Sequence, residues 1–266
     1  MKGVIFWTLW QRRWSIVWWA AGLTAFIFIN MVFYPSFRDQ STEFEKTFAQ
    51  IPDTAKALLS DTGDFLSPVG YLSSQIFYLM MPMLLGILAI SAGASLIGRE
   101  EKEGTIELLL ARPLSRTKLL AAKATTGAAI VIAIGIVGTM VTTVMAKAVD
   151  LAVPFGAVML AGLAATALAL SFGAVAFMIS VLGSLGRAAS IGVSTVVALG
   201  GYILVSLAGT VSWLAWPAKA FPFYYYHPGE ILEGTYHWSN MLFILVLAVV
   251  CGVVSWLAFR RRDIGV

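Results

Sequence analysis

Six long apolar stretches limit what this chain can fold into. They cover residues 14–34, 71–98, 119–146, 151–186, 188–218 and 236–259, and Lys123 is the one charged residue inside them. About 20 apolar residues cross a bilayer as a helix, and spans of this length satisfy their backbone hydrogen bonds in lipid only as helices. Only 12% of the residues are charged, against about 25% in a soluble domain. The sequence therefore predicts an all-α integral membrane protein.

We predict six transmembrane helices within a single transmembrane domain, residues 1–266. The spans are placed at about 14–34, 71–98, 119–146, 154–182, 190–212 and 238–259. The fourth stretch is long enough for two spans, but an extra span would put Arg260, Arg261 and Arg262 outside. With six spans, 13 of the 18 Lys and Arg residues fall on the inner side. Because positive residues stay in the cytoplasm, we expect both termini there, and the basic charge reflects topology, with no nucleic-acid partner.

Three segments outside the spans have their own character. Residues 1–13 are aromatic and basic and predict a short interfacial helix at the inner membrane surface. The external loop 35–70 places Phe44, Phe48 and Ile51 at helical spacing, which favours a short amphipathic helix. Residues 213–237 are rich in Trp and Tyr, as at membrane interfaces. Three prolines break that segment, so we expect an external re-entrant or interfacial hairpin.

The densest charge lies in the predicted cytoplasmic loop 99–118, between spans 2 and 3. Ten of the 32 charged residues fall between Arg99 and Lys123. Gly104 can interrupt the helix that leaves the membrane, Thr105 can cap a new one, and Pro113 ends it. The pattern predicts a short helix lying across the inner face, with leucines on one side. Such a helix fits a groove on a partner protein, but it could also be a connector resting on lipid head groups.

The segment EEKEGTIELLLARPLSRTKLLAAK, residues 100–123, resembles the cytoplasmic loop of bacterial ABC exporter permeases of the type-2 (type V fold) class. The shared pattern is an acidic run, Gly-Thr, Glu-Leu-Leu-Leu, a small residue, proline, Ser-Arg and a lysine. The stretches FLSPVGYL, MMPMLLGILAI and FPFYYYHPGEIL agree more loosely with the same family. The resemblance covers most of the chain.

The resemblance implies that the loop is a coupling helix that docks into a separate ABC ATPase subunit. It also implies a homodimer of this chain with two ATPases, which would hold the ATP and Mg²⁺, in a bacterial or archaeal cell membrane. No cofactor is then expected on this chain. The implied contact residues are Glu100, Glu101, Glu103, Gly104, Thr105, Ile106, Glu107, Leu108, Leu109, Leu110, Arg112, Pro113 and Arg116.

Two absences from the sequence narrow the function. There is no G-x-x-x-x-G-K-[ST] motif, so the chain should not hydrolyse ATP, and we expect no catalytic residue on it. The predicted spans hold no Asp or Glu, whereas ion-coupled carriers usually keep an acidic group in the membrane. The missing carboxylates leave a path suited to an apolar or amphiphilic substrate, and the family resemblance implies its export. The alternatives are an ion-coupled secondary carrier and a non-transporting membrane anchor or signalling partner of an ATPase.

Three groups of residues could have a functional role instead of a purely structural one. The external His227, Glu230, Glu233 and His237 are weak candidates for a metal site, since their spacing could bring two ligands together. Alanines at 157, 161, 165 and 169, with Gly173, form a small-residue ladder that favours close helix packing or a dimer seam. Polar residues within the spans are expected to bond between helices or to line a path; they are Asn30, Ser91, Ser95, Thr139, Thr142 and Thr143.

Overall fold

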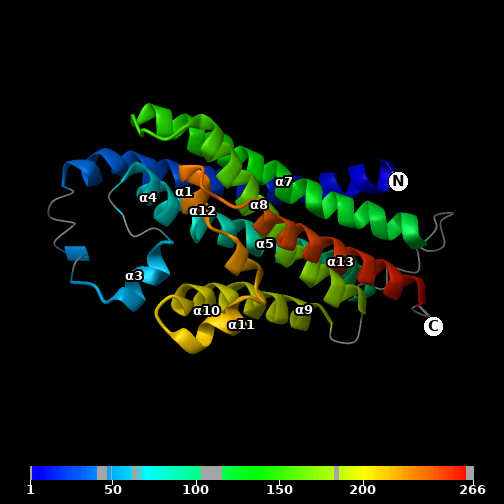
Figure 1. The fold of residues 1–266 in the computed structure, drawn as a ribbon. Helices are drawn as coiled ribbons and strands as arrows, with labels where there is room; N and C mark the ends of the chain where they lie inside the picture. Colours follow the sequence, from blue (N-terminus) through cyan, green and yellow to red (C-terminus); the bar gives the residue numbers. More distant parts are fainter. Residues whose placement is uncertain are drawn as a thin grey trace.

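The computed structural model describes residues 2–40, 47–48, 50–61, 65, 67–102, 116–182 and 186–261. Within these ranges the chain is helical and contains no strand (Figure 1). Six segments are long and apolar enough to cross a membrane, and the fourth apolar stretch is one helix, not two. The all-α, six-span prediction is therefore confirmed. The segments are Ile5–Asp39, Pro68–Leu96, Thr117–Ala148, Phe155–Leu182, Arg187–Ala208 and Ser239–Arg260.

Four spans are single helices and two are interrupted by a π-helical turn. The single helices are α1 (Lys2–Asp39), α7 (Arg116–Ala148), α8 (Phe155–Leu182) and α13 (Ser239–Arg261). The second span consists of α4 (Pro68–Leu72), η1 (Ser73–Phe77) and α5 (Met80–Lys102). The fifth consists of α9 (Gly186–Thr195), η2 (Val196–Gly200) and α10 (Gly201–Ala208). Single π-helical turns are rare in proteins, and those that do occur often lie at functional sites.

Helix α1 differs from the sequence prediction at both ends. The separate helix expected at 1–13 is instead the first part of α1, which continues unbroken from Lys2 to Asp39. No proline stands between Lys2 and Tyr34, so nothing in the sequence requires a break there. At the other end the helix continues past Pro35. Proline has no backbone N–H, so one backbone hydrogen bond is lost, and this loss affects only the final turns. Its 38 residues span about 57 Å, longer than the hydrocarbon core.

Helices α5 and α8 cross at the centre of the bundle through glycines. A Cβ atom at Gly93 would collide with the carbonyl oxygen of Gly173, and one at Gly173 would lie 2.9 Å from the Ala89 side chain. The small-residue ladder of α8 is buried within this one chain, with Ala161, Ala165 and Ala169 fully enclosed. The packing interpretation is confirmed. The dimer-seam alternative is wrong, because a second copy cannot reach residues buried inside the first.

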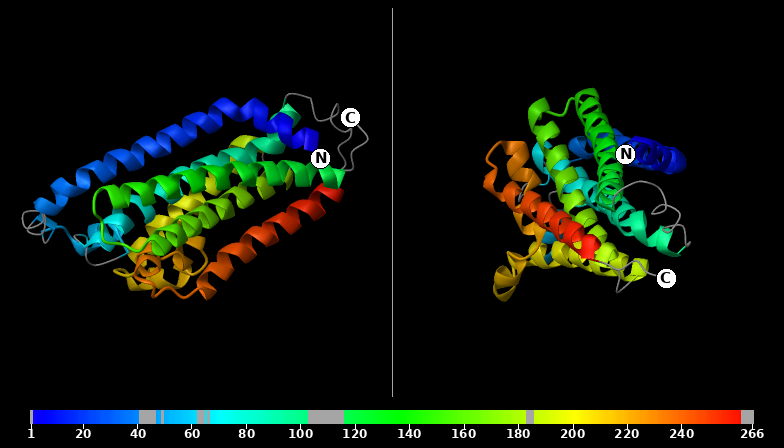
Figure 2. Two further views of the ribbon diagram at one scale, coloured as in Figure 1. Left: turned by 90° about the horizontal axis from the view of Figure 1, so that it is seen from above. Right: turned by 90° about the vertical axis from the view of Figure 1, so that its right-hand side faces the viewer.

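The remaining helices surround this crossing. Helix α1 packs along α7, α13 packs on α8, and α9 packs beside α5 and α8. Both termini lie at one end of the bundle, together with the end of α5 and the start of α7 (Figure 2). We call this the terminal end. The opposite end, the capped end, carries short helices: α3 (Asp53–Leu59), η3 (Ser212–Leu214), α11 (Ala215–Ala218), η4 (Pro222–Tyr225) and α12 (Pro228–Glu233).

The structure tests the predictions for the two external segments, 213–237 and 35–70, to different extents. Residues 213–237 are broken into short helices, and Pro222 and Pro228 each stand at the start of one, as the prolines predict. In the loop 35–70 the structure describes α3, which begins at Asp53, and residues 47 and 48 are helical as well. Residues 41–46 and 49 lie outside the described residues, so the amphipathic helix expected there stays a prediction. Phe44 lies outside the described residues, and Phe48 stacks on Phe65 with ring centroids 5.0 Å apart.

Candidate coupling region and transport path

The charged loop connects two helices that meet at the terminal end. Helix α5 continues to Lys102, so Glu100 and Glu101 lie in its last turn, and α7 begins at Arg116. The short helix expected between Gly104 and Pro113 lies outside the described residues and stays a prediction. So do the other implied contact residues: Glu103, Gly104, Thr105, Ile106, Glu107, Leu108, Leu109, Leu110, Arg112 and Pro113.

A side-chain hydrogen bond joins α1 to α5 close to this loop. The Arg12 guanidinium donates to the Ser95 hydroxyl oxygen at 2.7 Å, about two helical turns before the end of α5. Ser95 in turn donates to the Ala92 carbonyl at 3.2 Å. A hydrogen bond from a charged donor is roughly twice as strong as a neutral one. Movement of the end of α5 is therefore linked to the first part of α1.

Most polar side chains within the spans bond to their own helix. Thr139, Thr142 and Thr143 each donate to the carbonyl oxygen four residues earlier in α7, at 2.7–2.9 Å. Asn30 does the same in α1 at 2.9 Å. The expectation of bonds between helices is therefore wrong for Asn30, Thr139 and Thr142, because the carbonyl one turn back satisfies them locally. The Thr143 hydroxyl also lies 4.0 Å from the Met159 sulfur on α8. Ser95, which accepts from Arg12, likewise links two helices, α5 and α1.

An apolar cleft of about 140 Å³ lies between the second and fifth spans. Helix α5 contributes Pro82, Gly86 and Ile90, while Ala198 and Leu199 come from the π-helical turn η2. Its polar groups belong to Thr195 and Tyr202, and no charged residue lines it. The exposed side chains beside it on α9 and η2, Val193 and Val196, are apolar. This surface suits lipid, an apolar ligand or another copy of the chain.

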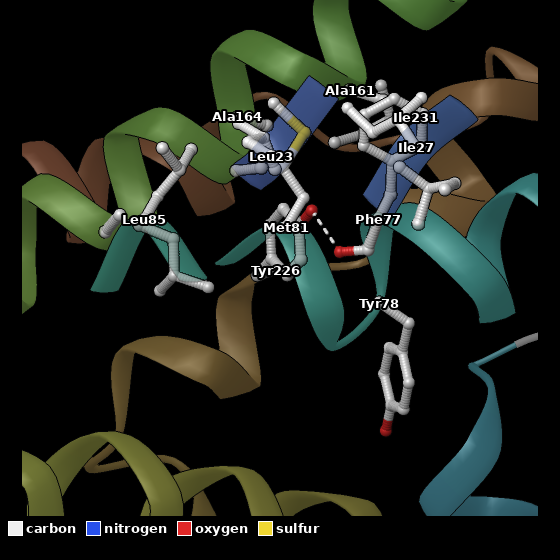
Figure 3. Close-up of a cluster of buried hydrophobic side chains, with 14 of the residues drawn as sticks. Leu23, Ile27, Phe77, Tyr78, Met81, Leu85, Ala161, Ala164, Tyr226 and Ile231 are labelled. Carbon is white, nitrogen blue, oxygen red and sulfur yellow. Dashed lines mark hydrogen bonds between the residues drawn. The ribbon is translucent and has the colours of Figure 1, made fainter. Parts of the chain in front are cut away.

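Hydrogen bonds that tyrosine hydroxyls donate and that Asp61 accepts hold the capped end together. The Tyr226 hydroxyl donates to the Phe77 carbonyl at 2.8 Å (Figure 3), at the last residue of the π-helical turn η1. The Asp61 carboxylate accepts from the Gly229 backbone N–H at 2.8 Å and also from the Ser73 hydroxyl. The external loop, the second span and α12 are thereby joined.

Burial also fixes the protonation of the external tyrosines. It raises the pKa of Tyr236 to about 12, with the Glu230 carboxylate adding to the effect. Burial raises the pKa of Tyr226 well above its ordinary value, and the negative charge of Asp61 adds to this shift. Both phenols therefore remain protonated donors at neutral pH. The Tyr236 hydroxyl donates to the Tyr225 carbonyl at 2.7 Å.

The weak metal candidates do not form a metal site of three ligands. His227 directly precedes α12, Glu230 and Glu233 lie within it, and His237 follows it. Among the residues that the structure describes, no three His, Cys, Asp or Glu side chains are grouped so as to hold a metal ion. The bundle thus offers an apolar cleft, a linked helix pair and a charged loop.

Comparison with known families agrees with this arrangement. The family model described as "ABC-2 family transporter protein" matches residues 11–264. The chain belongs to this family. The match covers nearly the whole chain, including every span and the charged loop, so this ABC-2 chain is a multi-pass membrane protein of the permease type. No curated protein matches the chain. Permeases of the ABC-2 family are the membrane subunits of ABC transporters, as the resemblance of the charged loop led us to expect.

Proposed function

We propose that this ABC-2 chain is the permease subunit of an ATP-driven exporter. Two copies pair with two separate ABC ATPase subunits, which hold ATP and Mg²⁺, in a bacterial or archaeal cell membrane. The family match over residues 11–264 carries the proposal. The chain itself performs no covalent chemistry, in line with the missing G-x-x-x-x-G-K-[ST] motif. Both termini lie in the cytoplasm, as the positive residues favour.

The charged loop is the contact with the ATPase. Residues 103–115 connect α5 to α7 at the terminal end, so a force on the loop acts directly on both helices. The Arg12–Ser95 hydrogen bond passes movement of α5 to α1. Helix α5 is also fixed to α8 through Gly93 and Gly173. Closure of the ATPases around ATP would therefore shift four spans together.

The cleft between the second and fifth spans is the proposed path for cargo. Its lining is apolar, apart from Thr195 and Tyr202, and no acidic residue lies inside the predicted spans. Such a surface recognises apolar or amphiphilic molecules. In a homodimer the cleft would face the second copy across the exposed side chains of α9 and η2, so that two clefts form one central path.

The two alternative functions, an ion-coupled carrier and a non-transporting anchor, would require different features of this chain. An ion-coupled carrier usually keeps an acidic group in the membrane, and the spans predicted here have no Asp or Glu. A non-transporting anchor for an ATPase would use the same loop and leave the cleft without a role. Transport that continues without ATP and collapses with a proton or sodium ionophore would favour the carrier. ATPase activity without any cargo movement would favour the anchor.

The first test is an affinity pull-down of the tagged chain from its native membranes, compared with Leu109→Glu. An ATP-binding subunit should copurify with the wild type and be lost in the variant, because a carboxylate cannot be buried in an apolar groove without large cost. Leu109→Met is the matched control, since it keeps size and apolarity and should retain the subunit. If no ATPase binds the wild type, the permease proposal fails for this loop.

A further inference from the structure

A second, larger cavity lies on another side of the central helix pair. It has a volume of about 410 Å³. It shares α5 and α8 with the cleft described above, but faces α7 and α13 instead of α9 and α10. Gly93 and Gly173 lie at its base, Ala124 on one wall and Gly252 on the other. Neither the coupling loop nor the proposed path accounts for it.

The lining of this cavity is suited to a hydrocarbon chain. Most of it is alanine, glycine and leucine, and polar groups come from Thr117 and Trp256. Ala121 on α7 and Gly252 on α13 line the cavity and are exposed, so it opens sideways between these two helices. Its volume is in the range of about 300–1,000 Å³ typical of ligand pockets. An opening between two spans faces the bilayer, where acyl chains are the most abundant occupants.

Basic side chains surround the end of the cavity nearest the terminal end. The Arg260 guanidinium carbon lies 4.8 Å from the centre of the Trp256 ring, and exposed Lys118 follows Thr117 on the opposite wall. Two acidic residues, Glu100 and Glu101, lie at this end in the last turn of α5, whereas the other described acidic residues belong to the capped end; these are Asp39, Asp53, Asp61, Asp150, Glu230 and Glu233. Trp and Arg at such a position commonly lie at the level of lipid head groups. Charge complementarity here selects an anion.

We infer that the cavity between α7 and α13 binds an anionic phospholipid, with one acyl chain inside and the phosphate beside Arg260. The apolar interior accounts for the chain, the lateral opening for its entry, and the basic rim for the charge of the head group. The site does not depend on the proposed export function, since it would form in a single copy of the chain without an ATPase.

The test uses the purified full chain in nanodiscs of phosphatidylcholine with a trace of photoactivatable phosphatidylglycerol, labelled in mid-chain. Cross-linked peptides are identified by mass spectrometry. Labels should concentrate on α7 and α13 around Ala124 and Gly252, and unlabelled phosphatidylglycerol should compete while phosphatidylcholine should not. Since the label is read on the isolated chain, its failure leaves the ATPase pull-down result unchanged, and the two proposals fail separately.

Three variants complete the experiment. A Cβ atom at Gly252 meets no other atom within 4 Å, so Gly252→Leu has room for its first side-chain carbon, adds a large side chain to the cavity wall and should abolish the labelling. Gly22→Leu on α1, where a Cβ also meets nothing within 4 Å, is the matched control and should leave it unchanged. Arg260→Gln should lower the preference for phosphatidylglycerol about fivefold, the effect of one basic residue near a lipid surface.

Two results would overturn the inference. Labels spread evenly over the exposed faces of α1 and α13, and unaffected by Gly252→Leu, would mean that only bulk lipid was sampled. Equal competition by the two lipids, together with no effect of Arg260→Gln, would show that the cavity does not select an anionic head group. Thermal unfolding of each variant confirms that it is folded. If Gly252→Leu does not fold, Ala124→Leu fills the same cavity from the opposite wall.

Discussion

The two ends of the bundle are held together by different kinds of contact. All eight tyrosines belong to the capped end, where hydroxyl groups bridge loops and spans, as Tyr226 does with Phe77. The terminal end has a small apolar cluster that includes Leu96, Leu120 and Phe259, beside a cavity of about 410 Å³. An open cavity forfeits packing contacts, so moving helices apart costs less at the terminal end.

This contrast fits a bundle that is driven from one end. If an ATPase acts on the loop between α5 and α7, the terminal halves of the helices should move and the capped halves should act as the fixed point. The Gly93–Gly173 crossing lies between them, and its close backbone contact makes it a suitable pivot. Variants at the capped end should therefore affect stability, and variants at the terminal end should affect coupling.

The largest effect is expected from Asp61→Ala at the capped end. The substitution removes the acceptor of the Gly229 N–H and of the Ser73 hydroxyl, and should lower the free energy of unfolding by about 3 kcal/mol. Thermal unfolding in detergent measures it. Asp53→Ala is the control, because Asp53 is exposed and pairs only with the nearby Lys56 in the described contacts. Equal losses in both variants would contradict a structural role for Asp61.

A smaller loss is expected from Tyr226→Phe. The Phe77 carbonyl at the end of η1 would lose its buried donor, which should cost about 2 kcal/mol in unfolding free energy. Tyr225→Phe provides a matched control, because the Tyr225 hydroxyl makes an exposed hydrogen bond to the Lys219 carbonyl that water can replace. If Tyr226→Phe were as stable as its control, the hydroxyl would not hold the capped end.

The terminal end gives the opposite expectation. Ser95→Ala removes the acceptor of the Arg12 guanidinium and should cost only about 1 kcal/mol in stability, while lowering cargo-stimulated ATPase activity of the assembled transporter. Ser255→Ala is the control, since its hydroxyl bonds to the Cys251 carbonyl within the same helix. Unchanged activity in Ser95→Ala would show that the link between α1 and α5 carries no movement.

The sequence predicted what depends on local composition. Six apolar runs, with Lys123 as the one charged residue inside them, were sufficient to place six spans, because hydropathy decides which segments enter lipid. The π-helical turns η1 and η2 were missed, since their extra residue per turn has no sequence signature here. The Arg12–Ser95 bond was missed as well, because the two residues lie 83 positions apart and pairing at that distance follows from how helices pack. The coupling contact predicted between Glu103 and Pro113 lies outside the described residues and stays a prediction.

The last expected effect is a change of stability that is absent at neutral pH and develops only at alkaline pH. Burial raises the pKa of Tyr236 in the folded protein to about 12, above its ordinary value of 10.0. The folded state therefore favours the neutral phenol, and this contribution to stability is fully present below pH 10.0 and is lost as the pH rises towards 12. The midpoint of thermal unfolding should fall over this range. In Tyr236→Phe the fall should be shallower, because phenylalanine does not ionise. If the unfolding midpoint fell equally with pH in the two proteins, ionisation of Tyr236 would not cause the loss of stability, and alkaline pH would act on another group.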